Sequence, residues 1–336
     1  METIGRRKLL RSAAGVASIT ALGPATGFLG SGSPTSSEAS PLAAVPAAAD
    51  AVVYADVDTI RTDEGVQVLT DTYLRQRAQS PYYEGPDGYD ELLAEIETEW
   101  ETDPKKLHEV TAFGGFGGRD GLFADYGGAV LEADLSAGNV ADALANLDDV
   151  DFEAVGRSGS VVYEPDGDGP WVGTLPSERV VVGTEGAVAD AIGVANGDRA
   201  GVEPDLTAVF GRTRAAPVRF ASRLPRPRNL PTSTAADSGE EIDLTPARDI
   251  VAVGGSVFRD GAVRALETTV YTQSSDAAAD VAEMLGKLRD RAAAQLRAGP
   301  TADLVGDIAI ERDGTTVRTG LKQTVGELRA VVEDAT

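Results

Sequence analysis

The chain has 336 residues, of which 54 are acidic and 30 basic, so its formal net charge at neutral pH is −24. It contains no cysteine and a single histidine, His108, which excludes disulfides, zinc–thiolate sites, iron–sulfur clusters and thiol nucleophiles. Apolar residues make up 42% of the sequence, enough for a sizeable core, so a fibrous or wholly disordered chain is excluded as well.

The N-terminus has the pattern of an export signal. Arg6 and Arg7 precede a weakly apolar stretch, 13–29, that is rich in Ala, Gly, Ser and Thr. This pattern resembles a twin-arginine signal, which implies a partnership with the twin-arginine export machinery. We assign residues 1–30 to the signal segment and residues 31–46, which are rich in Ser, Pro and Ala, to a flexible spacer. The only membrane contact expected is through this signal, if it is not cleaved, because no second run of about 20 apolar residues follows.

From residue 51 onward, strand-like and helix-like segments alternate. Residues 51–58 alternate apolar and polar side chains, which predicts a half-buried strand. The other elements expected in this half are helices at 64–79, 89–100, 139–147 and 186–194 and strands at 110–113, 129–135, 152–163 and 179–182. We assign residues 47–200 to a first α+β unit, with the two early helices as an insertion.

The second half repeats much of this order. The segment 250–256 (IVAVGGS) resembles 110–116 (VTAFGGF), and a strand and an alanine-rich helix follow each of them. The elements expected here are strands at 263–271, 308–311 and 316–321 and helices at 276–296 and 325–332, with a hairpin turn at Asp313–Gly314. We assign residues 201–336 to a second α+β unit that contains an acidic, aperiodic surface loop at 233–245.

The fold class predicted is therefore α+β, with two related units that each form an antiparallel sheet with helices on one face. The strands alternate rather than being apolar throughout, and this favours antiparallel sheets with one face against helices. Internal duplication explains the similarity of the two halves. The alternative is the coincidence of ordinary α+β patterns.

The composition indicates where the protein works. It is acidic, poor in lysine and rich in Ala, Val and Gly, and in this it resembles exported proteins of extreme halophiles, most of all haloarchaea. In about 1 M salt the screening length falls to about 3 Å, which largely removes the repulsion between surface carboxylates. The resemblance implies an extracellular or cell-surface location and no catalytic residue; an acidic protein of a mesophile is the alternative. The negative charge argues against nucleic acid as a partner.

A run of arginines is the largest departure from this acidic composition. Six arginines lie between positions 212 and 228 with no acidic residue among them: Arg212, Arg214, Arg219, Arg223, Arg226 and Arg228. Two interpretations stay open. The run is either a docking patch for an anionic component of the envelope, or a set of internal partners for carboxylates of the first half.

The remaining candidate sites are weak. Asp166 and Asp168 alternate with glycines, as calcium ligands do, but the loop lacks further oxygen ligands and a solvated hairpin turn explains it better. His108 has no recognisable nucleophile motif and is expected to be a surface histidine near a helix end. The glycine-rich stretch 113–128 lacks the spacing of a phosphate loop and is expected to be a hairpin. The sequence thus predicts no catalytic residue and no cofactor.

Nine of the eighteen aromatic residues fall between Tyr73 and Tyr126. They could line a ligand pocket or form the core under the inserted helices. The function predicted is that of a non-enzymatic exported or envelope protein that binds a ligand or an envelope partner. The alternative is an exported hydrolase that cleaves a glycan with two carboxylates, although the sequence singles out no such pair.

Overall fold

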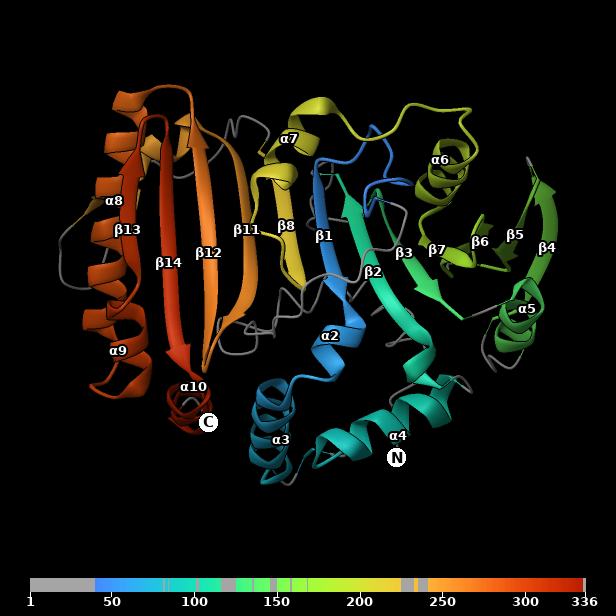
Figure 1. Ribbon diagram of the computed structural model, residues 1–336, viewed down its shortest axis with the longest axis horizontal. Helices are drawn as coiled ribbons and strands as arrows, with labels where there is room; N and C mark the ends of the chain where they lie inside the picture. Colours follow the sequence, from blue (N-terminus) through green and yellow to red (C-terminus); the bar gives the residue numbers. More distant parts are fainter. Residues whose placement is uncertain are drawn as a thin grey trace.

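The structure is a computed structural model that describes residues 40–334, except for 81, 84, 101–102, 116–124, 135, 146–149, 158, 168, 225–232 and 235–240 (Figure 1). The strands of the first half are β1 (Ala51–Asp56), β2 (Leu107–Gly114), β3 (Gly127–Ala133), β4 (Phe152–Arg157), β5 (Ser160–Pro165), β6 (Trp171–Leu175) and β7 (Arg179–Gly183). Its helices are α2 (Val57–Arg61), α3 (Glu64–Ala78), α4 (Tyr89–Trp100), α5 (Ala137–Ala145) and α6 (Glu185–Ala195), with a 3₁₀ turn at Pro104–Lys106.

The second half has a similar mixture of elements. Its strands are β8 (Val218–Arg223), β9 (Ser233–Thr234), β10 (Ile242–Asp243), β11 (Ile250–Asp260), β12 (Val263–Thr272), β13 (Ala309–Asp313) and β14 (Thr316–Thr324). Its helices are α7 (Pro204–Arg212), α8 (Ser275–Gln295), α9 (Pro300–Gly306) and α10 (Val325–Asp334), with a 3₁₀ turn at Thr245–Asp249.

Twelve of the described strands form one antiparallel sheet in the order β13-β14-β12-β11-β8-β1-β2-β3-β7-β6-β5-β4. The predicted class, α+β with antiparallel pairing, is confirmed. The structure differs from the prediction in the number of sheets, because the two halves share this sheet instead of having one each. They meet where Ala51–Ala55 of β1 pairs with Val218–Ser222 of β8. Each of these strands would otherwise leave an edge of unpaired backbone groups, so their pairing satisfies both edges at once.

The strand order is the same on each side of this junction. It runs β1-β2-β3-β7-β6 in the first half and β8-β11-β12-β14-β13 in the second, while the hairpin β4–β5 has no counterpart. This agrees with the similar sequence patterns of the two halves. An origin by duplication stays a prediction.

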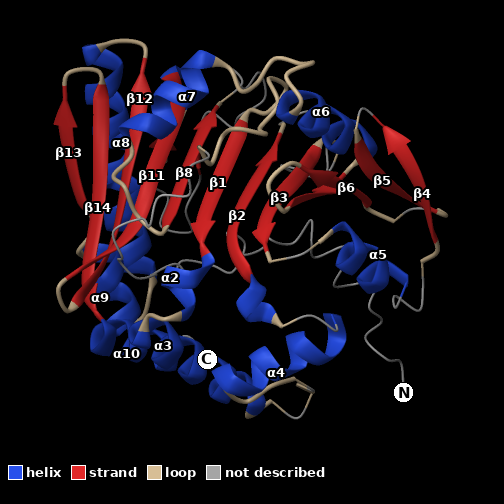
Figure 2. Cartoon of the chain, turned by 45° about the vertical axis from the view of Figure 1, so that its right-hand side comes forward, coloured by secondary structure: helices blue, strands red, loops and turns tan. Residues whose placement is uncertain are grey.

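Helices cover both faces of the sheet, whereas the sequence predicted one. On the face that carries Val52, Phe113 and Val181, here called the α6 face, the core includes Val188 of α6 and Leu206 of α7. The opposite face packs against α8, α5 and α10, in three separate apolar clusters. Both faces need cover because strands such as β2 bury consecutive residues and not only alternate ones. Figure 2 shows α6 and α7 at one end of the strands and α3, α4 and α10 at the other.

Two segments that the sequence assigned to loops take part in the fold. Leu42, Ala44 and Val45 belong to the predicted spacer 31–46, yet they are buried in the core of the α6 face. In the predicted loop 233–245, β9 pairs with β10 and the side chain of Ile242 is buried among residues of α8. Apolar side chains spaced among Ser, Ala and Asp are enough to anchor both segments, since each covers apolar surface that would otherwise face water.

A buried ion pair links the two halves on the opposite face. Asp63 precedes α3 and accepts a hydrogen bond from the backbone N–H of Val66, which caps the helix. Its carboxylate also pairs with Arg264 of β12, and both side chains are less than 5% exposed. Gly65 makes this contact possible, because a Cβ there would lie 2.3 Å from Nη2 of Arg264.

Among the described residues, no helix is long and apolar enough to cross a lipid bilayer.

Candidate functional site

Three carboxylates lie side by side across the sheet at the end of the strands next to α2. In the register of β1 with β2, Asp56 is opposite Glu109, and in the register of β2 with β3, Glu109 is opposite Glu132. Directly opposite residues have Cβ atoms about 4.5–5.5 Å apart, and like charges in such positions destabilise a sheet. We call these three residues the carboxylate row.

The middle residue of the row has an unusual environment. Tyr54, which is 5% exposed, donates a hydrogen bond to the carboxylate of Glu109. Burial is the main cause that raises the pKa of Glu109; the bond from Tyr54 opposes the rise, and the charges of Glu132 and Asp56 add to it. Burial and the carboxylate of Glu109 also raise the pKa of Tyr54, which stays protonated. Glu109 therefore holds a proton more readily than an ordinary glutamate does.

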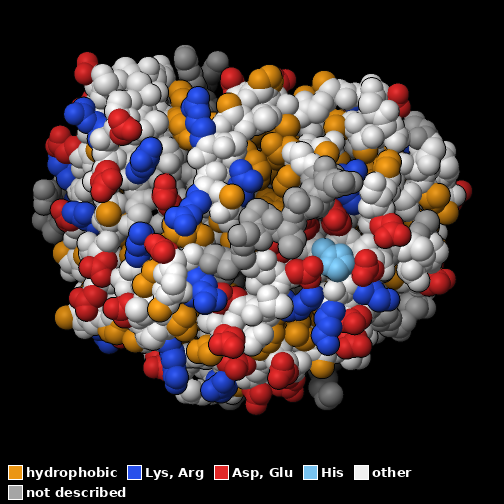
Figure 3. Space-filling model, in the orientation of Figure 1, with side chains coloured by type: hydrophobic (Ala, Val, Ile, Leu, Met, Phe, Trp, Pro, Cys, Tyr) orange, Lys and Arg blue, Asp and Glu red, His pale blue; other side chains and the backbone are white. Residues whose placement is uncertain are grey.

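His108 bridges two further carboxylates beside the row. Its Nδ1 lies 2.7 Å from Asp58 and its Nε2 lies 3.3 Å from Asp134. The register of β2 with β3 shifts between Leu107 and Glu109, so His108 is the extra residue of a β-bulge, which turns its side chain toward both acids. The hydrogen bond to Asp58 is the main cause that raises the pKa of His108. Figure 3 shows the histidine on the face seen in Figure 1, next to acidic side chains.

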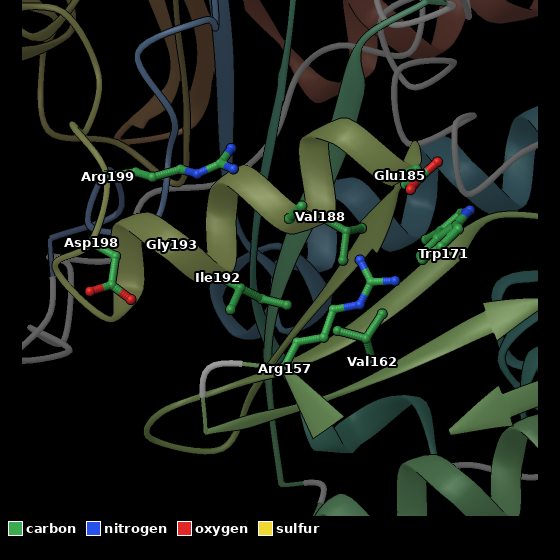
Figure 4. Close-up of a pocket in the computed structure, with 10 residues that line it drawn as sticks. Arg157, Val162, Trp171, Glu185, Val188, Ile192, Gly193, Asp198 and Arg199 are labelled. Atoms are coloured by element: carbon green, nitrogen blue, oxygen red, sulfur yellow. The ribbon is translucent and has the colours of Figure 1, made fainter. Parts of the chain in front are cut away.

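A pocket of about 230 Å³ lies between α6 and the strands β4, β5 and β6 (Figure 4). We call it the α6 pocket. It is lined by Arg157, Val162, Trp171, Glu185, Val188, Ala189, Ile192, Gly193, Asp198 and Arg199. Close packing of α6 on β6 forms its floor: a Cβ at Gly173 would lie 2.8 Å from Cδ1 of Ile192, so glycine is required there.

The charged side chains of the α6 pocket fall into two groups. Arg157 pairs with Glu164 and lies over the ring of Trp171, with its Cζ 5.3 Å from the ring centroid. Arg199 pairs with Asp190, which also accepts a hydrogen bond of 2.9 Å from the hydroxyl of Tyr126. Neither partner, Glu164 or Asp190, lines the pocket.

The two carboxylates that line the pocket differ from these arginines. Glu185 is in the first turn of α6, and Asp198 follows the end of that helix. In the described part of the chain, neither carboxylate has an ion-pair partner. Gly197, with a φ of 79°, ends α6 in a Schellman motif in which the backbone N–H of Asp198 donates to the carbonyl of Gly193 at 2.8 Å. This backbone geometry fixes Asp198 at the rim.

The described members of the arginine run have different environments. Arg219 donates to the carbonyl of Phe210 at 2.7 Å, and Arg223 pairs with Asp50 at 3.0 Å. Arg212 and Arg214 are exposed and lie over the rings of Tyr271 and Phe258. The two remaining candidates, Arg226 and Arg228, are outside the described residues.

The other predicted sites are placed only in part. Asp166 is in the turn after β5, where its N–H donates to the carbonyl of Asp151, and Asp168 is outside the described residues. Within the described ranges, no group of three or more His, Asp or Glu side chains is arranged to hold a metal ion. The signal arginines Arg6 and Arg7 also lie outside the described part.

Comparisons with known proteins show no family for this chain. No family model matches it, and no curated protein does. Two solved structures of TP0453, in crystal forms III and IV, are similar to it with TM-scores of 0.45 and 0.44 and sequence identities of 9% and 12%. They cover 88% and 87% of this chain and 98% and 96% of their own. A likeness this distant carries no argument about function.

Sequence reasoning missed the α6 pocket and the carboxylate row. The row joins three strands, and only the register of a sheet shows that Asp56, Glu109 and Glu132 are neighbours. Trp171 stands in a strand of five residues between Pro170 and Pro176, too short for a clear alternation. Glu185 stands directly before the predicted helix 186–194, and an acidic residue is common at a helix start, so it gives no signal of a site.

Proposed function

We propose that this chain is an exported, non-enzymatic binding protein of a halophile's cell envelope, and that it holds a small ligand in the α6 pocket. The observation that supports this proposal is the construction of the pocket. Its floor is made of the buried side chains of Val162, Val188 and Ile192, and charged groups stand around its rim. Apolar concave surface with a few polar groups at its border is typical of small-molecule sites.

Location and chemistry support the proposal in different ways. Export rests on the twin-arginine pattern at Arg6 and Arg7, and life in brine rests on the net charge of −24. The binding role rests on geometry alone. Cleavage of the twin-arginine segment would leave the binding role unaffected.

A thermal-shift screen of small soluble molecules in about 1 M KCl tests the binding role. We expect at least one compound to raise the melting temperature of the wild type and to have no effect on Ala189→Phe, which fills the pocket from α6. Ala294→Phe, at an exposed position of α8, is the matched control and should respond as the wild type does. A screen in which every stabilising compound acts equally on Ala189→Phe would refute the proposal.

The carboxylate row favours a second candidate, the hydrolysis of a glycan. Retaining glycosidases hold two carboxyl groups about 5–5.5 Å apart, one of which has a raised pKa and acts as the acid. Glu109 has that raised pKa, and Glu132 stands opposite it in the register of the sheet. In this alternative Glu109 protonates the leaving oxygen while Glu132 attacks the anomeric carbon and the glycosidic bond breaks. Water, deprotonated by Glu109, then attacks that carbon and releases the sugar from Glu132.

Chromogenic aryl glycosides test this alternative. If the protein hydrolyses one of them, Glu132→Gln should abolish the release of the aryl group and Glu109→Gln should slow it most for poor leaving groups, which need the acid. Absence of hydrolysis by the wild type at every pH between about 4 and 9 removes the enzymatic alternative.

A further inference from the structure

We infer that the α6 pocket is built for a small organic cation, namely an ammonium group with apolar substituents. This inference rests on the proposed binding role and adds the class of ligand. The sequence did not indicate this site, and the predicted partner of the chain was an anionic one. Three features of the described residues carry it: the apolar floor, the aromatic wall and the balance of charge.

The floor and the wall suit a compact apolar body. Val162, Val188 and Ile192 are each less than 5% exposed, so their side chains offer packed methyl groups and no hydrogen-bonding partner. Trp171 forms one wall, and its indole is larger than any other side chain of the lining. A ligand that fits in about 230 Å³ loses its hydration shell here and finds no hydrogen-bonding partner on the floor. Any charged group that it carries must therefore be one that an apolar or aromatic surface can stabilise.

The protein itself shows that the face of Trp171 accepts a cation. The guanidinium of Arg157 lies over this ring at 5.3 Å, within the range of cation–π attraction. Indole has the strongest attraction for cations among the aromatic side chains, and quaternary ammonium ligands are recognised in this way. Figure 4 shows the Arg157 side chain reaching from its strand toward α6, beside Trp171 and Val162. The guanidinium thus occupies the position that an ammonium ligand would take.

The balance of charge also favours a cation. Both arginines of the lining are neutralised by acids outside it, Arg157 by Glu164 and Arg199 by Asp190. The two carboxylates of the lining, Glu185 and Asp198, have no ion-pair partner among the described residues. Glu185 begins α6 beside Trp171, and Asp198 lies beyond the other end of that helix (Figure 4). A cationic ligand over Trp171 therefore meets the negative charge of Glu185, whereas an anionic ligand would have to displace an existing salt bridge and face that carboxylate.

Arg157 can leave the ring without losing its partner. Its side chain is 43% exposed and that of Glu164 is 27% exposed, so the pair lies at the surface. The arginine has a long flexible stem and can turn toward solvent while its guanidinium stays with Glu164. Arg157 then competes with a cationic ligand for Trp171 but attracts an anionic one. Its removal should therefore change the affinities for cations and for anions in opposite directions. Removal of Arg157 tightens the binding of a cation and weakens that of an anion.

Three probes of the same shape separate the classes. Choline carries a trimethylammonium group, 3,3-dimethylbutan-1-ol replaces it with a neutral tert-butyl group, and 3,3-dimethylbutanoate carries a negative charge. Their binding is followed by the fluorescence of Trp171 in the Trp100→Phe background, since the chain has two tryptophans. The titrations are made in about 1 M KCl, where the screening length is about 3 Å and distant charges do not contribute.

We expect choline to bind about tenfold more tightly than the neutral alcohol and the carboxylate not to bind. The double variant Glu185→Gln/Asp198→Asn should weaken choline binding about three- to tenfold, and Arg157→Ala should strengthen it by a similar factor. The control Asp205→Asn, an exposed carboxylate on α7 outside the pocket lining, should leave the affinity unchanged. Melting temperatures of all variants show that each of them folds.

The outcomes separate the ligand class from the binding role. Equal binding of choline and the alcohol, tighter binding of the carboxylate, or weaker choline binding by Arg157→Ala would overturn the cation assignment, while the α6 pocket remained a binding site. Failure of all three probes overturns the cation assignment in the same way if the thermal-shift screen finds another ligand of the pocket. Failure of that screen as well removes both proposals.

Discussion

Two ionic clusters flank α2, and they differ in one physical respect. Asp63 follows the helix and pairs with Arg264 in a site where both side chains are less than 5% exposed. Asp58 lies in the helix and pairs with His108, whose side chain is 32% exposed. The first cluster is closed to water and the second is open to it. A charge that loses its partner in the closed cluster stays desolvated, whereas one in the open cluster is hydrated at once.

This difference shows which polar contacts hold the fold and which are free to change. The closed pair joins α3 of the first half to β12 of the second, and Asp63 also caps α3. In the open cluster, the partners of His108 are acids that face solvent, so the cluster can gain or lose a proton without unfolding the chain. We therefore assign a structural role to the closed pair and expect the open cluster to respond to pH.

Asp63→Ala should have the largest effect, a loss of about 3–5 kcal/mol in the free energy of unfolding, because Arg264 would remain buried without its partner. The measurement is denaturant unfolding at constant salt. Asp58→Ala, which removes an acid of the open cluster, is the matched control and should cost no more than about 1 kcal/mol. Equal losses in the two variants would mean that burial does not distinguish the clusters.

Gly65→Ala tests the closed pair without removing a charge. Its Cβ would lie 2.3 Å from Nη2 of Arg264 and 2.8 Å from Cγ2 of Val325, so we expect a loss of about 1–3 kcal/mol through displacement of the pair. Gly286→Ala on α8 is the control, because nothing lies within 4 Å of its added Cβ. Alanine should stabilise that helix by about 0.4–1 kcal/mol. A stabilising effect at position 65 would show that the site has room and that the contact with Arg264 is loose.

Much of the fold could be predicted from the sequence wherever the pattern within one element is strong. Helix α4 has the predicted bounds, and α8 begins and ends one residue before them, since Ser274 caps it by accepting from the N–H of Ala277. β1 was predicted to extend to Asp58. It ends at Asp56, because that carboxylate accepts hydrogen bonds from the N–H and the hydroxyl of Thr59 and starts α2.

Contacts between distant segments could not be predicted. Asp63 and Arg264 are 201 residues apart, and no local pattern relates them. β8 was not predicted, because its arginines were interpreted as a charged run and not as part of a strand. In β8 the arginines alternate with Val218, Phe220 and Ser222, as side chains of a strand do. The carboxylate row and the α6 pocket could not be predicted either, because both depend on strand register and on how a helix packs on the sheet. Sequence periodicity describes one element at a time, and a site that spans several elements depends on how they meet.

Glu109 is intermediate between the closed and the open cluster, because it is a half-buried acid with acidic neighbours. Its raised pKa means that the folded chain holds the proton more tightly than the unfolded chain, so the ionised group destabilises the fold above that pKa. Glu109→Gln should therefore stabilise the protein by about 0.5–1 kcal/mol at neutral pH. The gain should disappear as the pH falls through the pKa of Glu109 in the folded state, where the wild type becomes protonated. A loss of stability at neutral pH would show that the hydrogen bond from Tyr54 outweighs the repulsion.

His108→Gln should have the smallest effect and one that depends on pH. The hydrogen bond to Asp58 raises the pKa of His108 above its ordinary value of 6.5, so the stability that the protonated ring contributes is complete below that value and is lost as the pH rises through the folded pKa. We expect the variant to be about 0.5 kcal/mol less stable than the wild type near pH 6 and equal to it near pH 9. Asp134→Asn should give the same pH dependence with a smaller amplitude, because its oxygen lies 3.3 Å from Nε2 and its side chain is 68% exposed. A cost that stayed constant across this range would mean that His108 acts by packing in the bulge and not by its charge.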